Sequence, residues 1–123
     1  MRMDIECIRN ILLQAENDSF TIDHFEDKNY GLLLLNQYEI KKLVYHIRLA
    51  NEFGFLKIIS AASSTIVKDL SAEGHLFLNT IRQEKVWMET KRISDETGLS
   101  TLDAVKQIAI NVASSLITGY FQR

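Results

Sequence analysis

The chain has 123 residues, of which 46% are hydrophobic and 24% are charged, and its formal net charge is −2. This length fits one domain with its own core, and no run of about 18 apolar residues suggests a membrane span. The start of the chain lacks the apolar stretch of a signal peptide, and Cys7, the only cysteine, has no internal disulfide partner. We therefore expect a reduced cytoplasmic protein that does not associate with membranes.

The first predicted helix starts at Asp4, a good N-cap residue. The apolar residues that follow recur at helical spacing; they are Ile5, Cys7, Ile8, Ile11, Leu12 and Ala15. Because Cys7 lies within this stripe, we expect a buried thiol and not a nucleophile, which needs exposure and a basic neighbour.

Residues 17–36 have a weaker pattern. Residues 20–25 alternate in a partly strand-like way, residues 26–31 are polar, and residues 32–35 form a short apolar run. We interpret this segment as a small hairpin.

The next helix is predicted from residue 37 to Phe53, with Asn36 as its cap and Gly54 as its stop. With about 100° per residue, the expected buried arc consists of Ile40, Leu43, Val44, Ile47 and Ala50. The remaining face consists of Lys41, Tyr45, Arg48 and Glu52. We therefore expect the first three of these side chains to be exposed together.

Two paired strands are predicted at residues 56–60 and 65–70, around the turn Ala61-Ala62-Ser63-Ser64. Ser71 is expected to cap a helix that buries Phe77, Leu78 and Ile81.

Two more helices are predicted towards the C-terminus. The first spans about Glu84 to Thr97, with Trp87 in the core and Gly98 as its stop. The last spans residue 101 to about 118, after a capping box formed by Ser100 and Asp103, and Gly119 is its expected stop. Its apolar stripe consists of Leu102, Val105, Ile108, Ala109, Val112, Ala113 and Leu116.

Several sequence strings resemble those of the DUF2513 family, a group of small proteins common in bacteria and their prophages. They are Ile8-Arg9-Asn10-Ile11-Leu12, Tyr45-His46-Ile47 with Gly54-Phe55-Leu56, and Gly74-His75-Leu76-Phe77-Leu78-Asn79-Thr80-Ile81-Arg82 followed by Val86-Trp87 and Lys91. The resemblance spans about residues 3–118 and implies a winged-helix-like fold without supplying an agreed function. In this chain Phe55 stands where the family more often has Leu, and Ser71 where it more often has Thr.

The order of helix, hairpin and capped helix also resembles the second half of a winged helix-turn-helix. We therefore predict a mainly α fold with a small β-hairpin, a winged helix-turn-helix-like domain with additional C-terminal helices. One domain is expected over residues 1–123, with a core at about 3–82 and a helical extension at about 84–119. The usual unit has a second helix before the one at 37–53, and here it would have to lie within residues 20–35.

No catalytic or metal-binding pattern is present in the sequence. His24, His46 and His75 are far apart and have no metal-ligand spacing, and there is no glycine-rich phosphate loop. We expect no enzymatic activity and no cofactor, and we interpret His46 and His75 as partly buried structural residues.

Two function classes stay open. In the first, a phage or prophage regulator binds double-stranded DNA through Lys41, Tyr45 and Arg48, with further contacts from Lys57 and Lys68 on the hairpin. In the second, a degenerate winged helix binds a protein partner and no DNA. The fold favours the first class. The acidic net charge, the missing helix and the long final stripe suit the second, and a hairpin tip without basic residues argues against a wing that reaches DNA. A solvated face with an ordinary Arg48–Glu52 pair is the plain structural interpretation of the helix.

The last helix also suggests self-association. Ala109 and Ala113 lie four residues apart in its apolar stripe, and small residues at this spacing let a second helix approach closely. The stripe could close the monomer's own core or form a homodimer about a two-fold axis.

Overall fold

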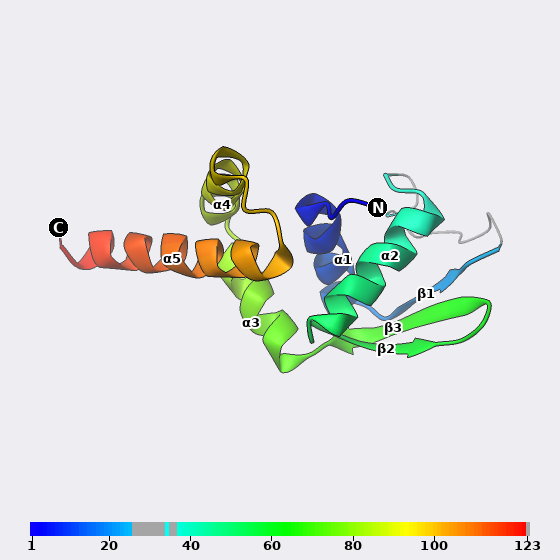
Figure 1. Ribbon diagram of the computed structural model, residues 1–123. Coiled ribbons are helices and arrows are strands. Elements are labelled where there is room, and N and C mark those ends of the chain that lie inside the picture. The colour runs from blue at the N-terminus through cyan, green and yellow to red at the C-terminus, as the bar shows by residue number, and fades with distance from the viewer. Residues whose placement is uncertain (26–33, 35–36, 123) are drawn as a thin grey trace. The chain divides into compact units, whose positions relative to one another are not determined.

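The computed structural model describes residues 1–25, 34 and 37–122 (Figure 1). Their contacts divide the chain into two compact units, Met1–His75 and Leu76–Arg123. The described part is mainly helical with a small three-stranded antiparallel sheet. This confirms the predicted combination of helices, a β-hairpin and additional C-terminal helices.

The first unit contains helices on one side of the sheet. Helix α1 (Ile5–Asn17) packs on strand β3 and on helix α2 (Ile40–Glu52), and α2 packs on strand β2 (Figure 1). Asp4 caps α1 as predicted, because its carboxylate accepts hydrogen bonds from the backbone N–H groups of Glu6 and Cys7 at 3.0 and 3.4 Å. Cys7 is fully buried.

The sheet has the strand order β1-β3-β2. Strands β2 (Leu56–Ser60) and β3 (Ser64–Leu70) form the predicted hairpin, and β1 (Phe20–Asp23) pairs antiparallel with β3. The register shifts between Lys57 and Ile58, which pair with Asp69 and Val67. Lys68 is therefore the extra residue of a bulge.

The start of helix α3 (Ala72–Ile81) is tied to the end of α2. The Ser71 hydroxyl accepts a hydrogen bond from the Gly74 N–H at 3.0 Å, as expected of a cap, and donates one to the Gly54 carbonyl. Gly54 has a φ of 85°, which confirms it as the stop after α2. A Cβ at Gly74 would lie well inside van der Waals contact with the Phe55 carbonyl oxygen, so only glycine fits there.

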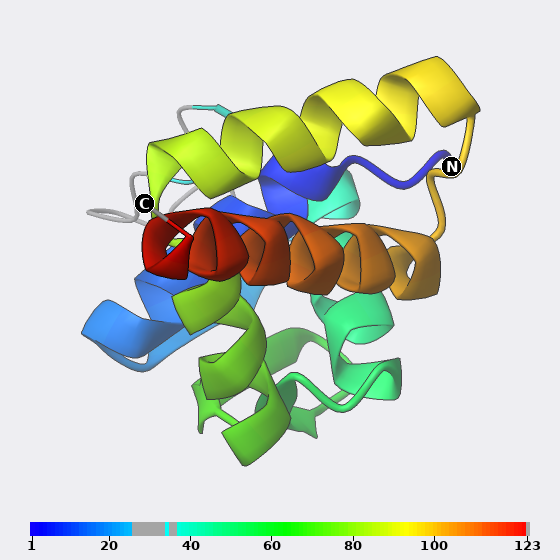
Figure 2. The same cartoon turned by 90° about the vertical axis from the view of Figure 1, so that its left-hand side faces the viewer.

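In the second unit, helices α4 (Glu84–Thr97) and α5 (Leu102–Phe121) pack against each other (Figure 2). Gly98, with a φ of 72°, ends α4 as predicted, and Trp87 is buried. No helix in the described part of the chain is both long and apolar enough to cross a membrane.

Four local predictions need correction. Helix α2 begins at Ile40 and not at residue 37, and the predicted cap Asn36 lies outside the described residues. Residues 20–23, predicted to be part of a local hairpin, form a strand that pairs with β3. Most of the other residues of that predicted hairpin lie outside the described residues.

The other two corrections concern α5. Thr101 replaces Ser100 as its cap, because the Thr101 hydroxyl accepts from the Ala104 N–H at 3.2 Å. The helix continues through Gly119 to Phe121, because a glycine within a helix costs only about 1 kcal/mol and neighbouring residues compensate for it.

Candidate functional site

The outward side of α2 carries the sequence-predicted contact residues. Lys41 and Arg48 are exposed and Tyr45 is half-buried. The buried residues of the helix lie on the opposite side; they are Leu43, His46, Ile47 and Ala50. We call Lys41, Tyr45, Arg48 and Glu52 the α2 face. The predicted exposure is confirmed for Lys41 and Arg48 but not for Tyr45, which is half-buried.

The buried arc of α2 differs in detail from the prediction. Ile40 and Val44, expected in the core, are only half-buried, and His46 is fully buried. The arc is displaced because α1 packs against the side of α2 that carries His46, where the polar atoms of the ring find partners.

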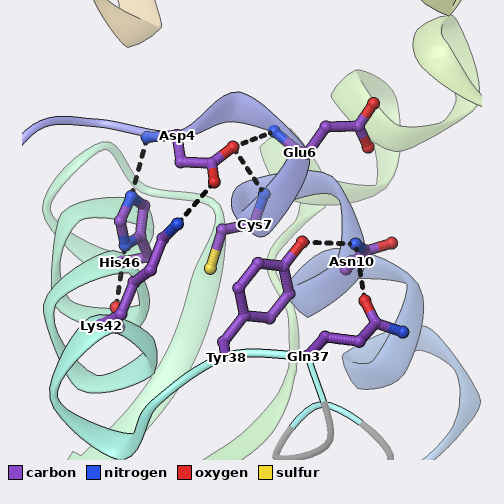
Figure 3. Close-up of polar contacts among 8 residues, drawn as sticks. All are labelled: Asp4, Glu6, Cys7, Asn10, Gln37, Tyr38, Lys42 and His46. Atoms are coloured by element: carbon purple, nitrogen blue, oxygen red, sulfur yellow. Dashed lines mark hydrogen bonds and ion pairs between the residues drawn. The ribbon is translucent and has the colours of Figure 1, made fainter.

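Three side chains hold α2 against the start of α1 (Figure 3). The backbone N–H of Asp4 donates to Nε2 of His46 at 2.8 Å, and Nδ1 of the same ring lies 2.8 Å from the Lys42 carbonyl oxygen. Since Nε2 accepts a hydrogen bond, the ring carries its proton on Nδ1 and is neutral. Nζ of Lys42 lies 2.7 Å from Oδ2 of Asp4.

These contacts and burial influence the protonation states of His46, Asp4 and Cys7. Burial lowers the pKa of His46, and the nearby Lys42 charge acts in the same direction. Burial opposes ionisation of Asp4, but hydrogen bonds from Lys42 and the Cys7 N–H outweigh it and lower the pKa of this carboxyl. Burial and the Asp4 charge raise the pKa of the Cys7 thiol to about 12, so the thiol is protonated and inert.

A groove of about 1040 Å³ runs along the α2 face. Tyr38 and Glu39, which precede the helix, line it together with Met1 from the N-terminus and His24 from the end of β1. Apolar side chains of α2 also line it, among them Val44 and Leu49. The surface is therefore hollow and mixed, with cations, carboxylates, aromatic rings and apolar groups together.

The cations of the α2 face have no acidic partner among the described residues. The structure gives no ion pair or side-chain hydrogen bond to Lys41 or Arg48 there, although ion pairs occur elsewhere, as between Lys42 and Asp4. The expected Arg48–Glu52 pair is not among the ion pairs of the described residues. Both positive charges are thus available to a ligand.

The structure does not bring the hairpin lysines to this groove. Lys57 and Lys68 are exposed on the sheet, but neither lines the groove. They belong to the positions opposite the buried side of the sheet, which includes Leu56 and Val67. Hence only three of the five predicted contact residues share one surface.

Sequence reasoning missed several groove residues. Tyr38 lies just before the helix and His24 directly follows strand β1, so no helical periodicity connects them with Lys41. His75, expected to be partly buried, has a side chain that is 49% exposed, with Nε2 4.0 Å from Oδ1 of Asp69.

Among the described residues no three His, Cys, Asp or Glu side chains form a group that could hold a metal ion.

Comparison with known proteins connects the chain to other sequences but not to a solved fold. A family model described as a hypothetical protein, DUF2513, matches residues 2–100. A protein of Haemophilus influenzae (strain ATCC 51907 / DSM 11121 / KW20 / Rd), described as an uncharacterized protein, is 29% identical over 125 residues, which cover 95% of this chain and 99% of the relative. No solved structure matches.

Proposed function

We propose that this chain, which belongs to the DUF2513 family, binds double-stranded DNA through the α2 face as a winged-helix module. The observation that carries the proposal is the pair Lys41 and Arg48, exposed on one side of a helix and without an acidic partner among the described residues. Tyr45 lies between them on the same face. Cationic side chains supply phosphate contacts, and Arg can also bind guanine in the major groove.

The order of the elements supports this proposal. In a winged helix, a helix leads directly into a β-hairpin, and the strand before that helix pairs with the second strand of the hairpin. Here α2 leads into β2 and β3, and β1 pairs with β3. We therefore propose α2 as the recognition helix; the preceding helix of the motif is expected in a segment that lies largely outside the described residues.

The charge of the first unit predicts weak binding by one copy. Residues 1–75 contain eight Lys or Arg and eleven Asp or Glu, a formal net charge of −3, so attraction to DNA depends on local groups of cations such as those of the α2 face. With two phosphate contacts, the slope of log K against log salt is about −2, and affinity falls about tenfold between about 50 and 200 mM salt.

A gel-shift titration over a range of salt concentrations tests the proposal. We expect the double variant Lys41→Ala/Arg48→Ala to bind duplex DNA several-fold more weakly than wild type and with a flatter salt dependence. The matched control is Arg82→Ala/Lys85→Ala, which removes the same charge from exposed positions in the second unit. Equal loss in both double variants, or no binding by wild type at low salt, would contradict the proposal.

The hairpin contributes less than α2 in this account. Its tip, residues 61–63, is exposed but contains only alanine and serine, and Lys57 and Lys68 do not line the groove. We expect Lys57→Ala/Lys68→Ala to reduce binding less than the α2 double variant in the same titration. We further propose that the protein acts in the cytoplasm as a phage or prophage regulator.

Docking of a protein segment is a second candidate function, favoured by the hollow, mixed character of the groove. Val44 and Leu49 provide apolar contacts there, and Glu52 provides charge that repels phosphate. This function predicts no duplex binding by wild type at low salt. It also predicts that Lys41→Ala/Arg48→Ala leaves gel-shift behaviour unchanged, which separates it from the first proposal.

A further inference from the structure

Helix α5 presents apolar side chains on two sides. One side packs in the second unit and buries Leu102, Val105, Ile108 and Ala109. The other, which we call the outer α5 face, consists of Ile110, Ala113, Ile117, Tyr120 and Phe121. Ile117 is 59% exposed and Phe121 is 79% exposed. The two sides together span about 220° in helical projection, about twice the width that one packing surface requires.

The outer α5 face has the spacing of a helix-pairing surface. Ile110, Ala113 and Ile117 are separated by three and four residues, and Tyr120 follows after three more, which is the pattern of a coiled-coil seam. If two copies pair antiparallel about a two-fold axis near Ala113, Ile110 of one copy lies opposite Ile117 of the other. The small residue at the centre lets the helices approach closely.

The chemistry of this face favours a second copy over other occupants. No Asp, Glu, Lys or Arg occurs between Lys106 and Arg123, so the face offers no charge to a nucleic acid or to a charged protein surface. Helices that lie on membranes usually carry Lys or Arg on their polar side, and α5 has none there over these residues. An uncharged, self-complementary stripe matches a copy of itself.

We propose that a second copy of this chain covers the outer α5 face and forms a two-fold dimer. The four large exposed side chains offer on the order of 500 Å² per copy, less than the roughly 800 Å² per partner of a standard stable interface. We therefore expect a weak dimer whose population depends on protein concentration. The inference uses only residues of the second unit and does not depend on DNA binding.

Sedimentation equilibrium of the full chain tests the dimer. We expect wild type to approach twice its 14.1 kDa mass at high micromolar concentration. Ile117→Glu should stay monomeric, because it places a charge in the interface, while its exposure lets the monomer fold normally. The control Thr118→Glu adds the same charge to the exposed polar side of the same turn and should still dimerise.

A cross-linking measurement tests, independently of sedimentation, which residues of the two α5 helices face each other in the dimer. Cys7 is buried and inert, so a cysteine introduced on α5 is the reactive thiol of the chain. Under mild oxidation, Ala113→Cys should form a disulfide-linked dimer and Thr118→Cys should not. A monomer of 14.1 kDa at high micromolar concentration, or equal cross-linking at both positions, would overturn the proposal. So would a monomer that co-sediments with lipid vesicles, which would assign the face to a membrane surface.

Discussion

At the scale of single residues, His46 is a buried polar group that links α2 to the start of α1. Its ring is fully buried, receives a hydrogen bond from the Asp4 N–H and donates one to the Lys42 carbonyl. Protonation would put an N–H on Nε2, facing the N–H of Asp4, and would remove one of these bonds. The neutral ring therefore joins α1 to the helix that carries the α2 face.

This environment predicts a pH-dependent stability. Because the folded-state pKa of His46 lies below its usual value of 6.5, the unfolded chain takes up this proton first, and the free energy of unfolding falls as pH decreases through about 6.5. Asp4 also has a lowered pKa, so its contribution is lost in the same direction, but only below its ordinary value of 3.8.

Urea unfolding at a series of pH values checks this prediction. His46→Gln keeps a hydrogen-bonding side chain that does not titrate. We expect it to be less stable than wild type at pH 7 but to lose less stability between pH 7 and 5. The same pH slope in both proteins would show that His46 is not the group that titrates.

Sequence reasoning could place Asp4 as a cap and Cys7 in the core, because both depend on neighbours along one helix. It predicted only partial burial of His46, because the partner of Nε2 is a backbone N–H that lies 42 residues away in the sequence. The groove residue Tyr38 was missed for the same reason, since its hydroxyl is paired with Asn10 of α1.

At the scale of elements, the strongest constraints are the glycines and caps that join α2, the hairpin and α3. The sequence was sufficient to place Gly54, Ser71 and the hairpin strands, because stops, caps and alternation are local signals. The pairing of β1 with β3 is a contact between segments far apart in the sequence, and no turn residue predicts it.

The close approach at the start of α3 gives a second stability prediction. We expect Gly74→Ala to destabilise the protein by about 1–3 kcal/mol or more, because its new methyl group meets the Phe55 carbonyl oxygen. Gly119→Ala is the matched control, since the added Cβ at that helical position meets no atom within 4 Å, and it should stabilise α5 by up to about 1 kcal/mol. Thermal unfolding measures both, and equal midpoints for the two variants would contradict this account of α3.

At the scale of the whole molecule, the two proposals belong to different units. The family model matches residues 2–100 and therefore ends before α5, which carries the proposed dimer face. The proposed DNA contacts lie in Met1–His75, and the proposed dimer face lies in Leu76–Arg123. Composition alone could not separate these roles, because the net charge of −2 is the sum of −3 in the first unit and +1 in the second.

Together the proposals predict how assembly affects DNA binding. A dimer presents two α2 faces, so its salt slope should approach about −4, against about −2 for one copy. Ile117→Glu should halve the slope without removing binding, as measured by fluorescence anisotropy with a duplex long enough for two copies. An unchanged slope in this variant would mean that DNA binding and self-association are independent.

The most direct test of the central claim, DNA binding through α2, is a heteronuclear NMR titration of the full chain with a short duplex at low salt. We expect the largest amide shifts on the α2 face, at Lys41, Tyr45 and Arg48, and we expect them to diminish as salt is added. Unchanged spectra, or shifts confined to α4 and α5, would contradict the claim.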